Sequence, residues 1–160
     1  MKLWQTLKTL FARLARNKPR VVLDTNILIS ATIVPHGAPA RILAAALDGK
    51  ITLIVSARLV DEYLRVIQRP HISDKYHTIA PRVQEIALFL RYDTVVVLGE
   101  PTTPIILTDP KDDFLIASAV EGKANYIVSG DEHLLQLAKY RGIKIVTPRD
   151  FFAKVIGRTQ

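Results

Sequence analysis

The sequence predicts an α/β fold, a single domain built on a mainly parallel sheet of about five strands with helices on both faces. Short apolar runs alternate along the chain with segments of helical periodicity, which is the order typical of β-α-β units. The apolar runs are unbroken rather than alternating, and this indicates strands that are buried on both faces, as in parallel sheets. A length of 160 residues suits one domain with its own core.

Five apolar runs predict the strands, and the segments between them carry helical periodicity or end signals. The predicted strands are RVVLD (20–24), ITLIVS (51–56), TVVVL (94–98), YIVS (126–129) and IKIVT (143–147). The predicted helices are APARILAAALDGK (38–50), ARLVDEYLRVIQRP (57–70), PRVQEIALFLRY (81–92), DDFLIASAVEGK (112–123), DEHLLQLAKYRG (131–142) and PRDFFAKVI (148–156). Pro39 suits a helix start, Ser56 a helix N-cap and Pro70 a helix end. A proline-bearing loop occupies residues 99–111.

The net charge of +7 comes mostly from the N-terminus, where residues 1–20 hold six of the 22 basic residues and no acidic one. Leucines and Phe11 recur there on one stripe of a predicted helix, with Trp4 beside it. We therefore expect residues 1–19 to be a basic amphipathic extension and residues 20–156 to be the folded domain. Docking on the domain or binding a partner is the favoured role. Association with a membrane or nucleic-acid surface and a targeting peptide are the alternatives.

Composition excludes some chemistries. The chain has no cysteine, which removes disulfides, thiolate catalysis and cysteine-based zinc sites and suits a reducing compartment, so a cytoplasmic location is expected. The four histidines lack the paired spacing of a zinc site. No apolar run reaches the length of a membrane span.

Acidic residues fall where ligands bind in such sheets, which is outside the carboxyl ends of the strands. One acid ends the first predicted strand, one follows the fourth strand, two open the helix after the proline-bearing loop, and one lies in the second turn of helix 57–70. In chain order these candidates are Asp24, Glu62, Asp112 with Asp113, and Asp131. Four separate elements thus direct a carboxylate towards one end of the sheet.

Each acid also has an explanation without function. Asp113 and Asp131 sit where an N-cap or first-turn acid stabilises a helix dipole, and Asp24 suits an Asx turn. Glu62 suits a solvated ion pair along its helix, and Asp61 competes with it for the inward position. As a group, however, carboxylates about 5 Å apart repel by roughly 1–3 kcal/mol per pair. A divalent cation removes that repulsion, and oxygen ligands favour Mg²⁺ or Mn²⁺.

Four stretches together resemble a PIN-domain ribonuclease, and most closely the prokaryotic PIN-family toxins of toxin–antitoxin systems. They are VVLDTNILIS, SARLVDEYLRVIQRP, DPKDDFLIASA and YIVSGDEHLL, and the likeness extends over about residues 20–153. The order and spacing of the four stretches carry the resemblance, since DTN or SGD alone is weak.

The resemblance implies a parallel sheet with an acidic pocket and metal-dependent endonuclease cleavage of single-stranded RNA. It assigns the four catalytic and metal-binding acids to Asp24, Glu62, Asp113 and Asp131. It assigns supporting roles to Asn26, Ser129 and Asp112, and places Asp109 beside the site. The implied cofactor is Mg²⁺ or Mn²⁺. The implied partners are an RNA substrate, a cognate antitoxin protein and a second copy of the chain in a homodimer.

Two other protein classes fit the sequence less well, and two further alternatives remain open. A haloacid-dehalogenase-like phosphatase needs a second aspartate two residues after the first, and Asn26 occupies that position. A receiver domain needs a lysine at the end of a late strand, which YIVSGD lacks. A non-catalytic RNA- or protein-binding module on the same scaffold and a free-standing RNA-processing nuclease remain the alternatives.

Overall fold

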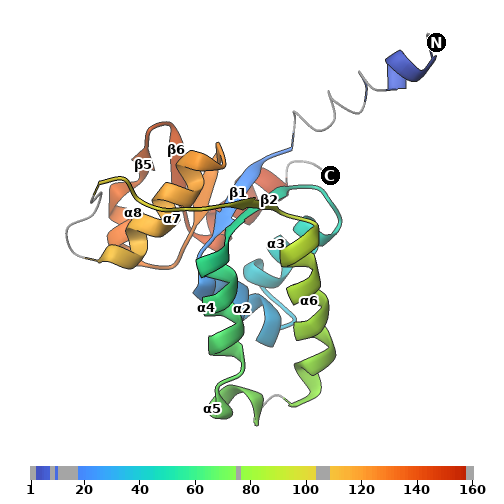
Figure 1. The fold of residues 1–160 in the computed structure, drawn as a ribbon, viewed down its shortest axis with the longest axis vertical. Helices are drawn as coiled ribbons and strands as arrows, with labels where there is room; N and C mark the ends of the chain where they lie inside the picture. Colours follow the sequence, from blue (N-terminus) through green and yellow to red (C-terminus); the bar gives the residue numbers. More distant parts are fainter. Residues whose placement is uncertain (1–2, 8–9, 11–17, 75–76, 104–108, 158–160) are drawn as a thin grey trace.

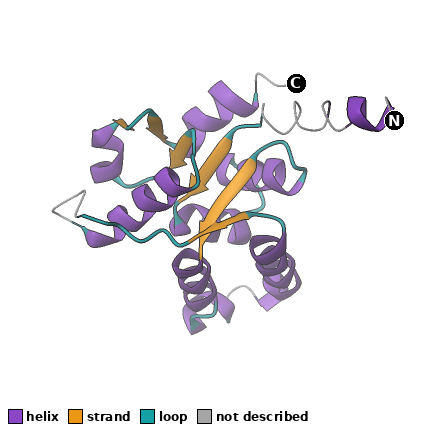
Figure 2. Cartoon of the chain, turned by 45° about the horizontal axis from the view of Figure 1, so that its top comes forward, coloured by secondary structure: helices purple, strands orange, loops and turns teal. Residues whose placement is uncertain are grey.

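The computed structural model describes residues 3–7, 10, 18–74, 77–103 and 109–157. Within these residues a six-stranded sheet has the order β3-β2-β1-β4-β6-β5, with helices on both of its faces (Figures 1 and 2). The strands are β1 (Arg20–Leu23), β2 (Thr52–Ser56), β3 (Val95–Val97), β4 (Tyr126–Val128), β5 (Lys139–Tyr140) and β6 (Ile143–Val146). All neighbouring strands are parallel except β5, which pairs antiparallel with β6. This architecture confirms the predicted fold class.

The middle of the sheet is the core of the domain. Val21 pairs with Leu53 of β2 on one side and with Tyr126 of β4 on the other. Val21 and Val22 are fully buried, as a parallel strand covered on both faces requires. Strand β1 is therefore held on both edges by hydrogen bonds and on both faces by packing.

The helices join the strands and cover the sheet. They are α2 (Thr25–Ile33), α3 (Ala38–Leu47), α4 (Ala57–Ile67), α5 (Pro70–Ser73), α6 (Ala80–Tyr92), α7 (Pro110–Glu121), α8 (Glu132–Leu137) and α9 (Pro148–Phe151). A 3₁₀ turn spans His77–Ile79, and a π-helical segment, Phe152–Ile156, continues α9. Helix α7 packs on β1, β2 and β4, whereas α2, α4 and α6 pack against one another. In Figure 1, α4 and α6 run side by side away from the sheet.

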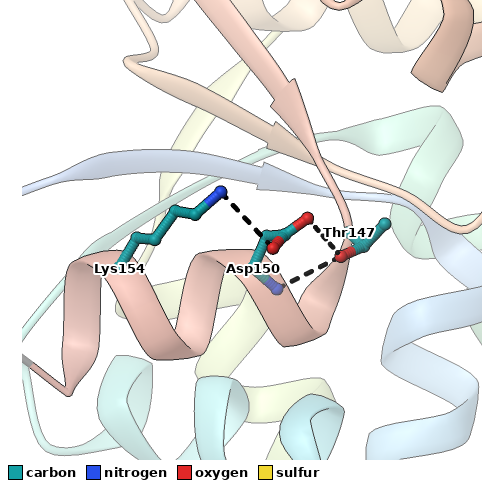
Figure 3. A network of polar contacts seen from close by, with 3 residues as sticks. All are labelled: Thr147, Asp150 and Lys154. Atoms are coloured by element: carbon teal, nitrogen blue, oxygen red, sulfur yellow. Dashed lines mark hydrogen bonds and ion pairs between the residues drawn. The ribbon is translucent and has the colours of Figure 1, made fainter.

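Local caps begin several of these helices. At α9, Thr147 Oγ1 accepts from the Asp150 backbone N–H at 3.1 Å and donates to Asp150 Oδ2 at 3.1 Å (Figure 3). Lys154 then pairs with Asp150 at 3.4 Å, one turn further along. This reciprocal arrangement satisfies a free amide at the helix start, and Pro148 occupies the first turn, where no amide is needed.

The strand order creates a switch point at β1. The chain leaves β1 and forms β2 and β3 on one side of it, then crosses to form β4, β6 and β5 on the other side. In open α/β sheets the crevice beside such a strand, at its carboxyl end, is where ligands bind.

The structure contains elements that the sequence analysis does not predict, among them α2, α5 and β5. Helix α2 was not predicted, because Ile27, Leu28, Ile29 and Ala31 are all buried and a helix buried all round loses its amphipathic pattern. The helix predicted over residues 131–142 ends at Leu137. Ala138 then has a φ of 56°, and the next two residues pair with β6 as strand β5. Tertiary pairing therefore wins over helical propensity at this sheet edge.

Only part of the N-terminal extension is described. Residues 3–7 are helical, and Leu3, Trp4 and Leu10 are exposed, whereas residues 1–2, 8–9 and 11–17 lie outside the described residues. In the described chain no single helix is long and apolar enough to cross a bilayer, although α2 and α3, bent by 94°, pass that test as a pair.

Candidate active site

A cleft of about 320 Å³ opens beside the carboxyl ends of β1 and β2, between α2, α4, α7 and the start of α8. Five of its lining residues are acidic, namely Asp24, Glu62, Asp109, Asp112 and Asp131. They lie up to 107 positions apart in the sequence (131 minus 24). The topology thus brings carboxylates from distant segments to one side of the molecule.

Three of these carboxylates are helix N-caps. Asp24 Oδ1 accepts from the Asn26 backbone N–H at 3.3 Å at the start of α2. Asp109 Oδ1 caps α7 through the Lys111 N–H at 2.9 Å. Asp131 Oδ1 caps α8 through the His133 N–H at 2.8 Å. In all three the capping bond uses one carboxylate oxygen, so it orients the side chain while the second oxygen can make a different contact.

Glu62 reaches the cleft from the middle of α4. The Ser56 hydroxyl caps this helix by accepting from the Leu59 N–H, and the helix then presents Glu62 half-buried. Thr25 Oγ1, itself buried, donates to Glu62 Oε2 at 3.0 Å and connects α2 to α4. Asp61 is exposed and is not among the lining residues. Helical periodicity alone left the choice between the two acids open, and the one that lines the cleft is Glu62, as the resemblance assigned.

The third acid of the cleft is Asp112, where the family resemblance assigned Asp113. Both side chains lie in the first turn of α7 and both are buried, with 6% and 4% exposed, but only Asp112 lines the cleft. Successive helix residues point about 100° apart, so only one of two adjacent acids can face a given wall. Asp112 is therefore the acid of this pair that lines the cleft, and the role that the resemblance assigns to Asp113 stays a prediction.

Asn26 and Ser129 flank Asp24 in different ways. Asn26 is exposed and lines the cleft. Ser129 is fully buried, and its hydroxyl donates to Asp24 Oδ2 at 2.7 Å while accepting from the Asp131 N–H at 3.0 Å. The Ser129 hydroxyl therefore fixes the first and the last acid relative to each other. Thr25 was not singled out from the sequence, because nothing local distinguishes it from an ordinary turn residue.

Burial and repulsion between carboxylates raise the pKa of two acids of the cleft, Asp24 and Asp112. Desolvation raises the pKa of Asp24, and Asp131 and Glu62 add to the rise. The hydrogen bonds from Ser129 and Asn26 oppose it. For Asp112, desolvation and then the charges of Asp131, Asp109 and Asp24 raise the pKa to about 6, with His133 acting in the opposite direction. Such shifts gather at functional sites, where a cation or substrate supplies the missing compensation.

The donor set fits a hard divalent cation by its chemistry. Asp112 Oδ2 is buried and has no hydrogen-bond partner, so an acceptor is held out of water without compensation. The five acids that line the cleft offer carboxylate oxygens, which Mg²⁺ and Mn²⁺ prefer as ligands. As placed, however, no three Asp, Glu, His or Cys side chains of the described residues are arranged to hold one ion. The cleft is thus an acidic surface without a preformed coordination cage.

Comparison with known proteins gives two matches. A family model described as a PIN domain matches residues 20–133, which carry all five acids of the cleft. An uncharacterized protein of Methanocaldococcus jannaschii is 32% identical over 148 residues, which cover 87% of this chain and 93% of that protein.

Proposed function

The chain belongs to the PIN-domain family, which indicates a nuclease, and from this premise we propose that it is a Mg²⁺- or Mn²⁺-dependent endoribonuclease that cleaves single-stranded RNA. The observation that supports the proposal most is the meeting of acids from four elements in one cleft, with Asp112 carrying a buried oxygen that has no partner. Such an arrangement destabilises a protein that has no cation to bind there.

The proposed roles follow from the contacts of each side chain. Asp24, Asp112, Asp131 and Glu62 would hold one or two Mg²⁺ or Mn²⁺ ions, which supply the charge that activates water and offsets the phosphate. The hydrogen bonds from Ser129 and from the Asn26 N–H orient Asp24 and favour its ionised form, since both oppose the rise of its pKa. Glu62, held by the Thr25 hydroxyl, would accept a proton from the attacking water.

The test is cleavage of a labelled single-stranded RNA by the purified chain in Mn²⁺ and in EDTA. We expect cleavage in Mn²⁺ alone, and a loss of at least about 100-fold in Asp24→Asn, because removing a ligand charge removes transition-state stabilisation. Equal cleavage by parent and variant would identify a contaminating nuclease. Absence of cleavage in both would favour a non-catalytic RNA- or protein-binding module.

Adjacent acids provide matched controls in the same assay. Glu62→Gln and Asp112→Asn should lose activity, whereas Asp61→Asn on the exposed side of α4 should retain it. Asp113→Asn tests the assignment that the resemblance made. If Asp113→Asn is folded by circular dichroism and inactive while Asp112→Asn is active, the third acid is Asp113 after all.

The biological setting that we propose is a toxin of a toxin–antitoxin system that acts in the cytoplasm as a homodimer. Support comes from the resemblance of the four sequence stretches to prokaryotic PIN toxins. A neighbouring gene whose small product binds this chain and stops cleavage is the expected finding. A chain that cleaves RNA and has no such neighbour would instead be a free-standing RNA-processing nuclease. Sedimentation measures the oligomeric state.

The basic extension is proposed to serve as a partner-binding arm. Leu3, Trp4 and Leu10 are exposed, so apolar surface is available for a partner or for a membrane. Deleting residues 1–19 and measuring cleavage, RNA affinity and vesicle binding separates these roles. The arm is supported if cleavage persists while one of the two binding activities falls.

A further inference from the structure

The cleft also has a cationic side. Arg58, Arg69 and Lys111 line it together with the acids, and all three side chains are exposed. Arg58 lies in the first turn of α4 and Arg69 just beyond its end, eleven residues later, which is roughly 16 Å along a helix. The positive charge therefore extends along the cleft.

These cations do not neutralise the acids beside them. Among the described residues the ion pairs are Lys50–Asp48 and Lys154–Asp150, and neither contains a residue that lines the cleft. Positive side chains that stay unpaired next to five carboxylates are available to a polyanion. A strand of nucleic acid entering an acidic site needs such compensation for its own phosphates.

One of the three cations is held flat. Arg58 Cζ lies 3.6 Å from the centroid of the Phe114 ring, so the guanidinium stacks on the ring face. Phe114 comes from α7, two residues after Asp112, so the stack of Arg58 on Phe114 lies beside the acids of the cleft. Stacking on one face leaves the opposite face of the guanidinium exposed and its N–H fork accessible.

We infer that the Arg58–Phe114 stack is a nucleobase platform, on which an unstacked base of single-stranded RNA lies, while Arg69 and Lys111 contact phosphates. The inference rests on the proposed function, since it names how the substrate of that same cleft is held. A planar guanidinium backed by an aromatic ring accepts any base through its π face, so the platform selects unpaired strands rather than a base sequence. In a duplex the bases are stacked inside and cannot reach it.

The test is binding of labelled strands to the full chain in EDTA, at one fixed salt concentration, measured by fluorescence anisotropy. The probes are a single-stranded RNA, its duplex, and a strand of equal length without bases. The parent should bind the single-stranded RNA most tightly. Arg58→Lys keeps the positive charge and removes the planar guanidinium group. It should weaken binding of that RNA by about 5- to 150-fold, the range of one base stack, and leave the base-free strand almost unaffected.

Control variants separate stacking from charge and from folding. Arg65→Lys, an exposed arginine of α4 outside the cleft, should bind all three probes as the parent does. Lys111→Ala should weaken binding of all probes by a similar factor and, in a separate salt titration, reduce the salt dependence by about one counterion. Thermal melts of each variant verify that it is folded.

If Arg58→Lys loses the same affinity for the RNA as for the base-free strand, the platform is overturned and Arg58 only contacts phosphate. An unchanged affinity of Arg58→Lys would also overturn the platform, as would a parent that binds the RNA no better than the base-free strand. The result is independent of catalysis. If Arg58→Lys weakens binding of the RNA selectively but the parent does not cleave RNA in Mn²⁺, the base-binding platform is supported and the proposed nuclease activity is overturned. If the parent cleaves RNA but Arg58→Lys has no selective effect, the nuclease activity is supported and the platform is overturned.

Discussion

Asp112 is the carboxylate of the cleft that is least compatible with a negative charge. Its side chain is buried, its Oδ2 has no hydrogen-bond partner, and three other acids raise its pKa after desolvation. A carboxyl group with a pKa of about 6 in the folded chain, against 3.8 ordinarily, holds its proton where the unfolded chain has released it. The folded state therefore binds more protons than the unfolded state between about pH 4 and 6, and its stability falls as the pH rises through that window.

Asp112→Asn should remove this loss of stability. In EDTA at pH 7.5 we expect the variant to exceed the parent in free energy of unfolding by up to about 3 kcal/mol, and at pH 4 the two should be nearly equal. Urea unfolding at both pH values measures the difference. Asp61→Asn on the exposed surface should stay within about 0.5 kcal/mol of the parent at both. A variant less stable than the parent at pH 7.5 would show that the charge of Asp112 is compensated in the folded chain.

At the scale of single elements, the aspartates that cap the helices around the cleft are also the aspartates that line it. Asp24, Asp109 and Asp131 all begin helices, so the capping role predicted for Asp131 is confirmed, and it does not exclude a functional site. The helix supplies what a catalytic group needs, because the N–H to Oδ1 bond fixes the side chain through one oxygen and leaves the second oxygen to other contacts, as Asp24 Oδ2 has with Ser129. Acids at the starts of three helices around one crevice are thereby oriented before any ligand arrives.

Substitutions at Asp131 separate the capping role of its side chain from the role of its negative charge. Asparagine caps a helix about as well as aspartate, so Asp131→Asn should keep the free energy of unfolding within about 0.5 kcal/mol of the parent and still lose cleavage. Asp131→Ala loses the bond to the His133 N–H as well and should cost about 0.5–2 kcal/mol in addition. Urea unfolding and RNA cleavage are measured on both variants. Full activity of Asp131→Asn would reduce Asp131 to a structural cap.

At the scale of the whole molecule, the position of β1 decides where the site lies. Strand β1 has β2 on one side and β4 on the other, so Asp24 at its carboxyl end is beside Ser129 after β4. Helices α4 and α7 then bring Glu62 and Asp112 to the same crevice. Charge of one sign gathered at one point of the fold lowers the stability of the metal-free chain, and binding of a cation to the folded state alone must raise it.

Mn²⁺ or Mg²⁺ should therefore raise the melting temperature. At a concentration of about 100 times Kd the stabilisation is about 2.7 kcal/mol, which corresponds to about 5–10 °C for a chain of this size. Circular dichroism melts in EDTA and in Mn²⁺ measure the shift, and the Asp24→Asn Asp131→Asn double variant should lose most of it. The same shift in parent and double variant would place the bound metal elsewhere on the molecule.

The sequence was sufficient for those features that depend on local patterns. Strand hydropathy, prolines and capping residues predicted the fold class and five of the six strands, and the four acidic stretches identified the family, because each signal is contained within a few residues. Local patterns did not decide which of two adjacent acidic residues faces the cleft. Glu62 and Asp61, like Asp112 and Asp113, differ by about 100° of rotation around a helix, so periodicity did not separate them and only the resemblance assigned Glu62. Packing of α4 on β2 and of α7 on β1, β2 and β4 sets that rotation. The pairing of β5 with β6, the burial of α2 and the Arg58–Phe114 stack likewise depend on partners far away in the chain, which no local pattern encodes.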